Sequence, residues 1–480
     1  MYFTISLIVI AVIFLFLDYR KRKKDHPPGP WGLPILGYLP FFHEDQFITF
    51  KKLAEEYGSI FSIKIATKEV IVVNDYDLIK EALVKQYKIF SGRPKSRFFE
   101  ELCNGNGFAF VDGLKHSVFR NFGINAINEF RMTSGTSVIK EEIDHMFQVI
   151  KEKKNKQVNC EDLIHKAIAN AAFCLVYGER SSYDDPEFNA IYKCTKQNGN
   201  DPFIPLVTFA YWARFLPPLN GRYKKFLANF HYEETSIRRK KEERKKQPEI
   251  RGTYSNYIDK FLDKMQSENQ TELFNEEQLV QNAHEIYGAS IDTTSNAICW
   301  CILGLLHCPE YQDRMWREIN GVIGSNTLNT EHRKEMPFTE AYIEEVLRFR
   351  PIIPLSLRRT IESTNLGRYR LPKDSTVAIN IWAVHHDPKY FKNPYDFKPE
   401  RFIDSNNRFV HCDKVIAFST GPRFCPGKRL ALNNIFLVLV SIVQKYKMSP
   451  PDKKSLPSFD EGIYGAVHGP HAFEVVFEER

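Results

Sequence analysis

The ten residues from Phe418 to Gly427, which read Phe-Ser-Thr-Gly-Pro-Arg-Phe-Cys-Pro-Gly, constrain the fold more than any other stretch of the sequence. Two glycines and two prolines surround Cys425, so the stretch must form a tight loop. Glycines also let backbone amides approach the sulfur, which suits a thiolate that needs hydrogen-bond donors. The apolar segment 428–446 that follows predicts a helix, whose N-terminal dipole would favour an anion on the loop. Composition alone still favours a purely structural cysteine.

Other interpretations of the glycines fit less well. Five residues separate Gly421 from Gly427, whereas a phosphate-binding P-loop has four, and Arg429 stands where a magnesium-binding Ser or Thr is needed. Gly105-Asn106-Gly107 lacks the third glycine of a dinucleotide fingerprint, and the sequence contains no H-E-x-x-H zinc motif. The sequence therefore predicts neither a nucleotide-binding loop nor a zinc-protease site.

The composition describes a folded protein that does not bind nucleic acid. Hydrophobic residues make up 43% of the 480 positions, which excludes a disordered chain. The formal net charge of +7 is small and partly concentrated near the N-terminus, so it does not suggest a nucleic-acid interface. The nine cysteines include no C-x-x-C pair, which argues against a disulfide framework or a zinc ribbon.

The first residues predict a membrane anchor. Met1 to Leu17 contain no charge, and as a helix they would extend about 25 Å. A block of five basic residues follows at 20–24, which predicts that Met1 faces the lumen and the rest of the chain the cytosol. A cleaved signal peptide is the alternative, although its charges would precede the apolar run. We predict a transmembrane anchor at 1–19, a basic and Pro/Gly-rich hinge at 20–37 and one domain at 38–480.

The body of the chain predicts a single large domain, because it has no second linker and no internal repeat. Short β segments are expected at Ile60–Ile65, Val70–Val73 and Val377–Trp382, with a terminal hairpin from about Ala472. Most of the remaining sequence has a helical pattern. The predicted fold class is therefore mainly α with a minor β part.

The longest predicted helix begins at the capping residue Asn275 and runs to His307, before Pro309. Its thirty or so residues would extend about 45 Å, enough to cross a whole domain. The middle, 288–294, reads Gly-Ala-Ser-Ile-Asp-Thr-Thr, which is a poor helix sequence. Ser and Thr hydroxyls can bond to carbonyls one turn earlier, so we expect a local distortion there.

Three motifs together resemble the cytochrome P-450 family. The cysteine loop matches every fixed position of that family's haem-binding signature, F-x-x-G-x-R-x-C-x-G. Glu345 to Arg348 matches its E-x-x-R and Pro399 to Phe402 its P-E-R-F, in the family's order along the chain. Alone, an exposed Glu345–Arg348 pair would contribute under about 1 kcal/mol. The likeness covers essentially the whole chain and is greatest to the animal microsomal branch, which oxidises drugs, steroids and fatty acids.

The resemblance implies a haem-binding site. The cofactor would be haem b, with the thiolate of Cys425 as the axial ligand of its iron. Glu345, Arg348 and Arg401 would form a buried structural cluster behind the cysteine loop. The haem and its propionates would be contacted by a further set of residues: Phe418, Arg423, Arg120, His116, which replaces the family's tryptophan, and Arg359, for which the adjacent Arg358 is an alternative.

The resemblance also assigns proton delivery during oxygen activation. Ala289 to Thr293 matches the family's A/G-G-x-D/E-T, except that Ser290 stands where glycine is usual. Asp292 and Thr293 are the predicted catalytic residues, because an acid and a hydroxyl can pass protons from bulk water. Ser290 would narrow the oxygen-binding groove and so slow activation or increase uncoupling.

The implied function is a haem-thiolate monooxygenase that inserts one oxygen atom of O2 into a lipophilic substrate. Electrons would come from NADPH through the NADPH-cytochrome reductase, with cytochrome b5 as a second candidate donor, at the endoplasmic reticulum membrane. Two alternatives stay open: a reductase-independent isomerase or dehydratase of oxygenated lipids, and a non-catalytic haem- or lipid-binding protein. The docking face is predicted at Lys414, Arg423, Lys428 and Arg429, and the substrate contacts at 98–111, 203–215 and 281–289.

Overall fold

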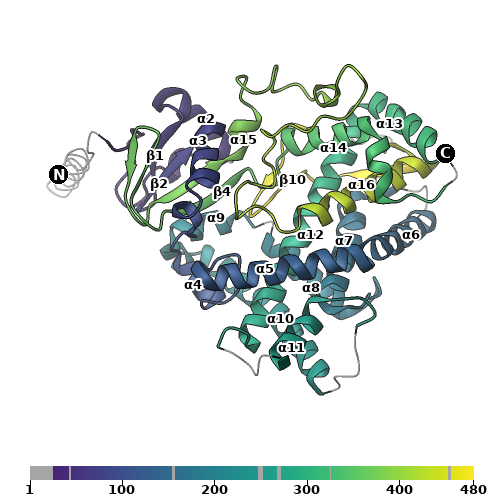
Figure 1. Ribbon diagram of the computed structural model, residues 1–480, viewed down its shortest axis with the longest axis horizontal. Coiled ribbons are helices and arrows are strands. Elements are labelled where there is room, and N and C mark those ends of the chain that lie inside the picture. The colour runs from purple at the N-terminus through teal and green to yellow at the C-terminus, as the bar shows by residue number, and fades with distance from the viewer. Residues whose placement is uncertain are drawn as a thin grey trace.

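The strands β1, β2 and β4 lie at one end of the molecule, and most of the rest is helical, with smaller pairs and groups of strands among the helices (Figure 1). The computed structural model describes residues 25–42, 45–153, 157–199, 201–246, 252–267, 272–324, 326–451 and 456–480. The predicted anchor at 1–19 and the basic block at 20–24 lie outside these residues. The prediction of a mainly helical fold with a minor β part is confirmed.

The main sheet joins two distant parts of the sequence. Its strands are ordered β1-β2-β7-β4, where β1 and β2 form an antiparallel hairpin, β2 and β7 run parallel, and β7 and β4 run antiparallel. The strands are β1 (Ile60–Ile65), β2 (Lys68–Val73), β4 (Leu355–Arg359) and β7 (Thr376–Asn380). The prediction for β1 is exact, whereas β7 ends at Asn380 because the chain turns there into a short helix capped by the Asn380 side chain.

The Pro/Gly-rich segment lies against this sheet. The backbone N–H of Ser62 donates to the carbonyl of Pro28, and that of Tyr38 donates to Lys64. A side chain on Gly29 would collide with the carbonyl of Ser62, so glycine is needed for this close approach. The described part of the predicted hinge, 25–37, is therefore packed along β1.

The helices cover the rest of the chain, and the long α12 runs through their middle (Figure 1). It packs against α7 and α16 and contributes many fully buried side chains, Trp300 among them. By length and composition α12 could also cross a membrane, but it is a buried core helix here. The helices are α2 (Gln46–Tyr57), α3 (Tyr76–Lys80), α4 (Arg97–Cys103), α5 (Gly113–Phe130), α6 (Thr136–Glu152), α7 (Cys160–Tyr177), α8 (Pro186–Gly199), α9 (Phe203–Phe209), α10 (Leu219–Lys246), α11 (Tyr257–Ser267), α12 (Glu276–His307), α13 (Pro309–Val322), α14 (Pro337–Phe349), α15 (Ile381–His385) and α16 (Lys428–Lys445).

The sequence predicted α12 well at its ends and less well in its middle. Asn275 caps the helix by accepting a hydrogen bond from the backbone N–H of Gln278. Ser290 and Thr293 donate to the carbonyls of Ile286 and Ala289, at 2.7 Å each. These are the expected hydroxyl bonds, yet the helix continues without a break, so the predicted distortion is absent. Burial on α7 and α16 outweighs the weak helix propensity of this stretch.

The predicted terminal hairpin is wrong. The last strand, β11 (Glu474–Glu479), pairs antiparallel with β3 (Gln157–Asn159) on one side and β8 (Tyr446–Ser449) on the other. One partner, β3, lies more than 300 residues earlier, and neither partner belongs to the segment after Ala472, so the local pattern there cannot reveal them. Two further two-stranded pairs are β5 (Thr364–Leu366) with β6 (Tyr369–Leu371), and β9 (Ile463–Tyr464) with β10 (His468–Gly469).

Candidate functional site

The cysteine loop is a chain of tight turns between the segment at Ile416 and α16. The backbone N–H of Cys425 donates to the carbonyl of Phe418 at 2.9 Å, and that of Phe424 donates to Gly421 at 3.0 Å. Gly421 has a φ of +73° and lies so close to the carbonyl of Leu83 that a Cβ would be only 1.8 Å from that oxygen. Glycine is therefore required twice at this position, for its conformation and for its size.

Backbone amides surround the sulfur of Cys425. The N–H groups of Gly427 and Lys428 lie against the thiol and favour its ionised form, as does the positive charge of Arg120. Burial has the larger and opposite effect, so the pKa of the Cys425 thiol is raised above its ordinary value. Stable ionisation of this sulfur therefore needs a further positive charge in contact with it.

Four arginines lie near the loop, of which Arg120 and Arg358 are buried and Arg93 and Arg423 half-buried, and we call them the arginine group. Burial, together with the charges of Arg93 and Arg120, lowers the pKa of Arg423 to about 9. Among the described residues the group has one ion pair with a carboxylate, between Arg423 and Asp112 at 3.1 Å. The group thus carries a large excess of buried positive charge.

Some donors of the arginine group have no partner. The Nε of Arg358 and the Nε and Nη1 of Arg423 are buried without a hydrogen-bond acceptor among the described residues. Buried donors are nearly always paired, and an unpaired charge is costlier still. These unpaired donors need negatively charged oxygen atoms as acceptors. A bound dicarboxylate would supply them.

The two adjacent arginines of β4 have different environments. Arg359 forms ion pairs with Asp112 and Asp374 and donates to the carbonyl of Arg93 at 2.8 Å. Arg358 has no carboxylate partner among the described residues, and one of its nitrogens donates to the hydroxyl of Ser419, in the cysteine loop, at 3.2 Å. Because successive residues of a strand face opposite ways, only one of the two can belong to the arginine group. The structure includes Arg358 in that group, whereas Arg359 lies at its edge and is neutralised by Asp112, which it shares with Arg423, and by Asp374.

Arg120 and His116 come from α5, one turn apart. Arg120 donates to the carbonyl of Phe424 at 2.6 Å, and its guanidinium lies 5.1 Å from the centre of the Phe424 ring. Burial, followed by the charges of Arg423 and Arg120, lowers the pKa of His116 to about 3. His116 is therefore a neutral imidazole beside the arginine group.

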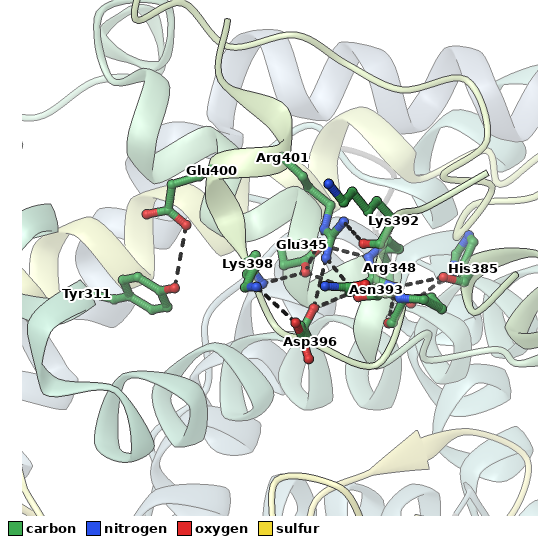
Figure 2. A network of polar contacts seen from close by, with 11 residues as sticks. Tyr311, Glu345, Arg348, His385, Lys392, Asn393, Asp396, Lys398, Glu400 and Arg401 are labelled. Atoms are coloured by element: carbon green, nitrogen blue, oxygen red, sulfur yellow. Dashed lines mark hydrogen bonds and ion pairs between the residues drawn. The ribbon is translucent and has the colours of Figure 1, made fainter. Parts of the chain in front are cut away.

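Glu345 is the centre of a buried polar network behind the loop (Figure 2). Arg348 donates to both of its carboxylate oxygens, at 2.7 and 2.9 Å. Arg401 and the backbone N–H of Lys398 donate to the same carboxylate, at 3.0 and 2.7 Å. Neither Glu345 nor Arg348 is exposed to solvent. Their pairing is thus a buried ion pair in which each charge is met by several hydrogen bonds.

His385 connects this network to the cysteine loop. Its Nδ1 lies 3.1 Å from the carbonyl of Arg348, and its Nε2 accepts a hydrogen bond from the backbone N–H of Ile416 at 2.9 Å. These two contacts require the tautomer with the proton on Nδ1. Burial and the charge of Arg348 lower the pKa of His385 to about 3, so the ring stays neutral and can accept from Ile416.

The predicted catalytic pair of α12 is divided between two faces of the helix. Asp292 is buried, with its carboxylate toward His165 of α7 and toward Gly199 at the end of α8. Thr293 is partly exposed, one turn from the exposed Ala289 in an otherwise buried helix. The Thr293 hydroxyl donates to Ala289, as described above. The accessible face of α12 is therefore that of Ala289 and Thr293.

Glu285 of α12 holds in place the chain segment that lies just before α5. One of its carboxylate oxygens accepts from the backbone N–H groups of Phe108 and Ala109, at 2.8 and 2.9 Å. A side chain on Gly107 would collide with this carboxylate. Two of the three segments predicted to contact substrate, 98–111 and 281–289, are thus held together by one acid.

Comparison with known proteins decides the family. The family model described as Cytochrome P450 matches residues 27–477. The chain is 31% identical to rat "Cytochrome P450 2F2" (Rattus norvegicus) over 471 residues, which is 96% of each chain. It is 30% identical to chicken "Cytochrome P450 2H2" (Gallus gallus) over 488 residues, 99% of each. The chain belongs to the cytochrome P450 family.

Cytochromes P450 bind haem with a cysteine thiolate as the axial ligand, and this chain fits that group. Haem carries two propionates, which would supply the anionic oxygens that Arg358 and Arg423 lack. Its ferric iron would supply the positive charge that the buried thiol of Cys425 needs. The charges of the cofactor are therefore complementary to the arginines at its propionates and to the thiolate at its iron.

Sequence reasoning named most of this site but missed three of its residues. The structure brings Phe418, Arg423, Cys425, Arg120 and His116 to one place. Arg93 and Asp112, on either side of α4, had no recognisable motif, and His385 lacked one as well. A search for arginines in loops that precede the family's motifs could have found Arg93. The residues next to His385 in the sequence contain no signal that marks this histidine as part of the site.

We predict that Glu345→Ala destabilises the fold by about 3–5 kcal/mol, because it leaves the fully buried guanidinium of Arg348 without a counter-ion and removes that of the half-buried Arg401. Urea-induced unfolding of the haem-loaded protein measures the loss. Glu400→Ala is the control, since Glu400 pairs with Arg314 where both side chains are more than a third exposed, and its loss should cost under about 1 kcal/mol. Equal losses in the two variants would contradict the assigned role of Glu345.

We predict that Arg358→Ala releases haem roughly tenfold faster than the wild type, because a charge-assisted hydrogen bond contributes about 1.5–3 kcal/mol. Haem transfer to an excess of a haem-scavenging apoprotein measures the rate. Arg359→Ala should release haem at nearly the wild-type rate, since Arg359 is paired with Asp112 and Asp374. Faster release from Arg359→Ala than from Arg358→Ala would reverse the assignment.

Proposed function

We propose that this protein is a membrane-anchored monooxygenase, which inserts one oxygen atom of O2 into a lipophilic substrate with electrons from NADPH through a flavoprotein reductase. Residues 1–19 would be the anchor in the endoplasmic reticulum membrane, 20–37 the link, and 38–480 the catalytic domain on the cytosolic side. Cytochrome b5 would be a second electron donor. Membership of the cytochrome P450 family supports the reaction class.

One observation carries the proposal: a cysteine whose sulfur receives backbone N–H groups lies beside arginines with buried N–H donors that have no acceptor among the described residues. Such a site is suited to an anionic ligand on one side and to a dicarboxylate on the other. A structural cysteine needs neither feature, because a neutral buried thiol is a small apolar group. The arrangement therefore supports haem-thiolate chemistry over a purely structural loop.

The chain's own residues divide the work around the cofactor. When bound, haem supplies the electron-accepting and oxygen-activating chemistry. Gly427 and Lys428 hold negative charge on the Cys425 sulfur through their backbone amides. The arginine group, with Phe418 beside the loop, would orient the cofactor. Thr293 presents its hydroxyl on the accessible face of α12, where a proton can be passed to oxygen.

Two of the segments predicted to contact substrate, 98–111 and 203–215, are rich in aromatic side chains. Phe98 is buried with Phe203, Tyr223 and Phe226 in one cluster, and Phe99 stacks on Phe110 with ring centres 4.0 Å apart. Such walls bind by burying apolar area and provide few polar groups to orient a ligand. They support a lipophilic substrate.

Reduction with carbon monoxide tests the central bond. We predict that the purified, chemically reduced protein shows the red-shifted Soret band of thiolate-ligated haem with carbon monoxide. Cys425→Ser should keep haem but lose that band, because a hydroxyl does not provide the anionic sulfur. Wild-type protein without the band would refute the proposal.

Turnover assays in the same experiment separate the alternative functions. A monooxygenase requires reductase and NADPH for product, whereas an isomerase or dehydratase needs only a lipid hydroperoxide. A non-catalytic haem- or lipid-binding protein gives product in neither assay. Product from hydroperoxide alone, or from neither mixture, would replace the proposed function by the corresponding alternative.

The reductase would dock on the cysteine-loop side through cationic residues. Arg429 is exposed and Lys414 partly so, whereas Arg423 is engaged with Asp112 and the arginine group. Lys428 also acts on the thiol of Cys425, so changing it would alter two properties at once. Arg429 and Lys414 are therefore the residues with which to test docking.

We predict that Lys414→Glu combined with Arg429→Glu slows reduction by the reductase several-fold at low salt, because the change reverses attraction to an acidic partner. The difference should shrink at high salt. Lys447→Glu is the control, because this exposed lysine follows α16, whose 18 residues extend about 27 Å from the cysteine loop. Stopped-flow reduction unchanged in the double variant would reject this docking face.

A further inference from the structure

A cluster of buried polar side chains lies on the inaccessible side of α12, where the haem site does not use it. His165 of α7 is fully buried, and its Nδ1 is 3.7 Å from the Oδ1 of Asp292. The thiol of Cys299 lies next to the same imidazole, and the thiol of Cys160 lies next to that of Cys299. Tyr192 of α8 completes the group, which we call the His165 cluster.

Some polar atoms of the His165 cluster lack hydrogen-bond partners, which is unusual for side chains that only stabilise a core. The Oδ1 of Asp292 and the hydroxyl of Tyr192 are buried without a hydrogen-bond partner among the described residues. Buried polar atoms without partners are costly, so they are uncommon where packing alone is the requirement. A chain of donors and acceptors that must exchange protons is a functional reason to keep them.

The His165 cluster leads to the protein surface. Glu161, one turn before His165 on α7, forms an ion pair with Lys196 of α8 at 2.9 Å, and both side chains are about a quarter exposed. The Lys196 ammonium lies 5.9 Å from the centre of the Tyr192 ring. Titratable groups therefore follow one another from solvent to Asp292 along the contact between α7 and α8.

We propose that His165 is a positioning residue that holds and resupplies the proton of Asp292 during oxygen activation. This inference rests on the proposed monooxygenase function and deepens it, because it states where the protons of that reaction come from. Asp292 then connects a proton source on the inaccessible face of α12 with Thr293 on the accessible face.

The charges around the pair support the sharing of one proton. Burial raises the pKa of Asp292 to about 6, and the charge of His165 opposes that rise. For His165, burial disfavours the charged form, but Cys299 and Asp292 outweigh it and raise its pKa. The other groups that face Asp292 are Glu233 of α10, Lys196 of α8 and Glu161 of α7. Near neutral pH the pair thus holds a proton that either member can carry.

The proton balance is simple. Asp292 releases one proton toward Thr293, and the Nδ1 of His165 passes its proton to the vacated carboxylate. His165 then accepts one proton from the side of the surface ion pair between Glu161 and Lys196, whose carboxylate lies one turn away on α7 and favours a proton on His165. Only O–H and N–H bonds form and break, and no electrons move.

Infrared spectroscopy tests the pair without any turnover. The difference between wild-type and Asp292→Asn spectra across a pH series isolates the C=O stretch of the protonated Asp292 carboxyl. The midpoint should lie near pH 6 in the wild type. In His165→Asn it should move to higher pH, because the positive charge that lowers the pKa of Asp292 is gone. An unmoved midpoint would overturn the proposal.

His468→Asn is the matched control for this measurement. His468 is also a buried histidine that packs on α12, where its ring lies 5.4 Å from that of Trp300, but it is not among the groups that face Asp292. The Asp292 midpoint should be unchanged in this variant. An equal shift in His468→Asn would mean that the shift reports disturbed packing, and would overturn the proposal as well.

A double-mutant cycle tests the functional consequence. We predict that His165→Asn lowers product formed per NADPH oxidised several-fold, and that Asp292→Asn does the same. The double variant should be no worse than Asp292→Asn, because His165 acts through Asp292. Losses that multiply, or unchanged coupling in His165→Asn, would overturn the proposal.

The two proposals can fail separately. Absence of the thiolate carbon monoxide band in the wild type would refute the monooxygenase while the infrared midpoints remain measurable. An intact band in His165→Asn, together with an unmoved midpoint and wild-type coupling, would refute only the role of His165.

Discussion

The buried pairing of Glu345 with Arg348 is the interaction on which the rest of the structure depends. One carboxylate meets Arg348 of its own helix, Arg401 and the backbone of Lys398, so two segments more than 50 residues apart in the sequence converge on it. From Arg348 the contact continues through the neutral ring of His385 to the backbone at Ile416. The start of the cysteine loop is therefore held by a rigid polar network, and the loop's position does not depend on the cofactor alone.

On the other side of the loop, the polypeptide by itself does not neutralise all of the charge at the site. The arginine group and the buried thiol of Cys425 each carry an electrostatic cost that the polypeptide does not remove. Haem removes both costs, since its propionates and its iron have the complementary charges. Binding of the cofactor and stability of the site are thus two aspects of one interaction, which explains why the chain can leave buried donors unpaired.

Local patterns predicted the parts of this protein that depend on neighbouring residues. Asn275 capped α12 as expected, and the glycines and prolines around Cys425 formed the loop they predict. The failures have a common physical origin. Whether Arg358 or Arg359 belongs to the arginine group depends on how β4 pairs with β7, and one partner of β11, the strand β3, lies more than 300 residues earlier in the chain. His385 and His165 gain their roles from contacts between helices, for which a single sequence contains no periodic signal.

The close approach of Gly421 to Leu83 has a consequence for biosynthesis. The loop also receives the Arg120 side chain from 304 residues earlier in the chain. During translation the N-terminal walls of the site emerge first and must wait for the C-terminal loop to complete them. Haem can therefore be captured in its final geometry only when nearly the whole polypeptide has left the ribosome, and the haem-free chain exposes an unfinished, strongly cationic surface until then.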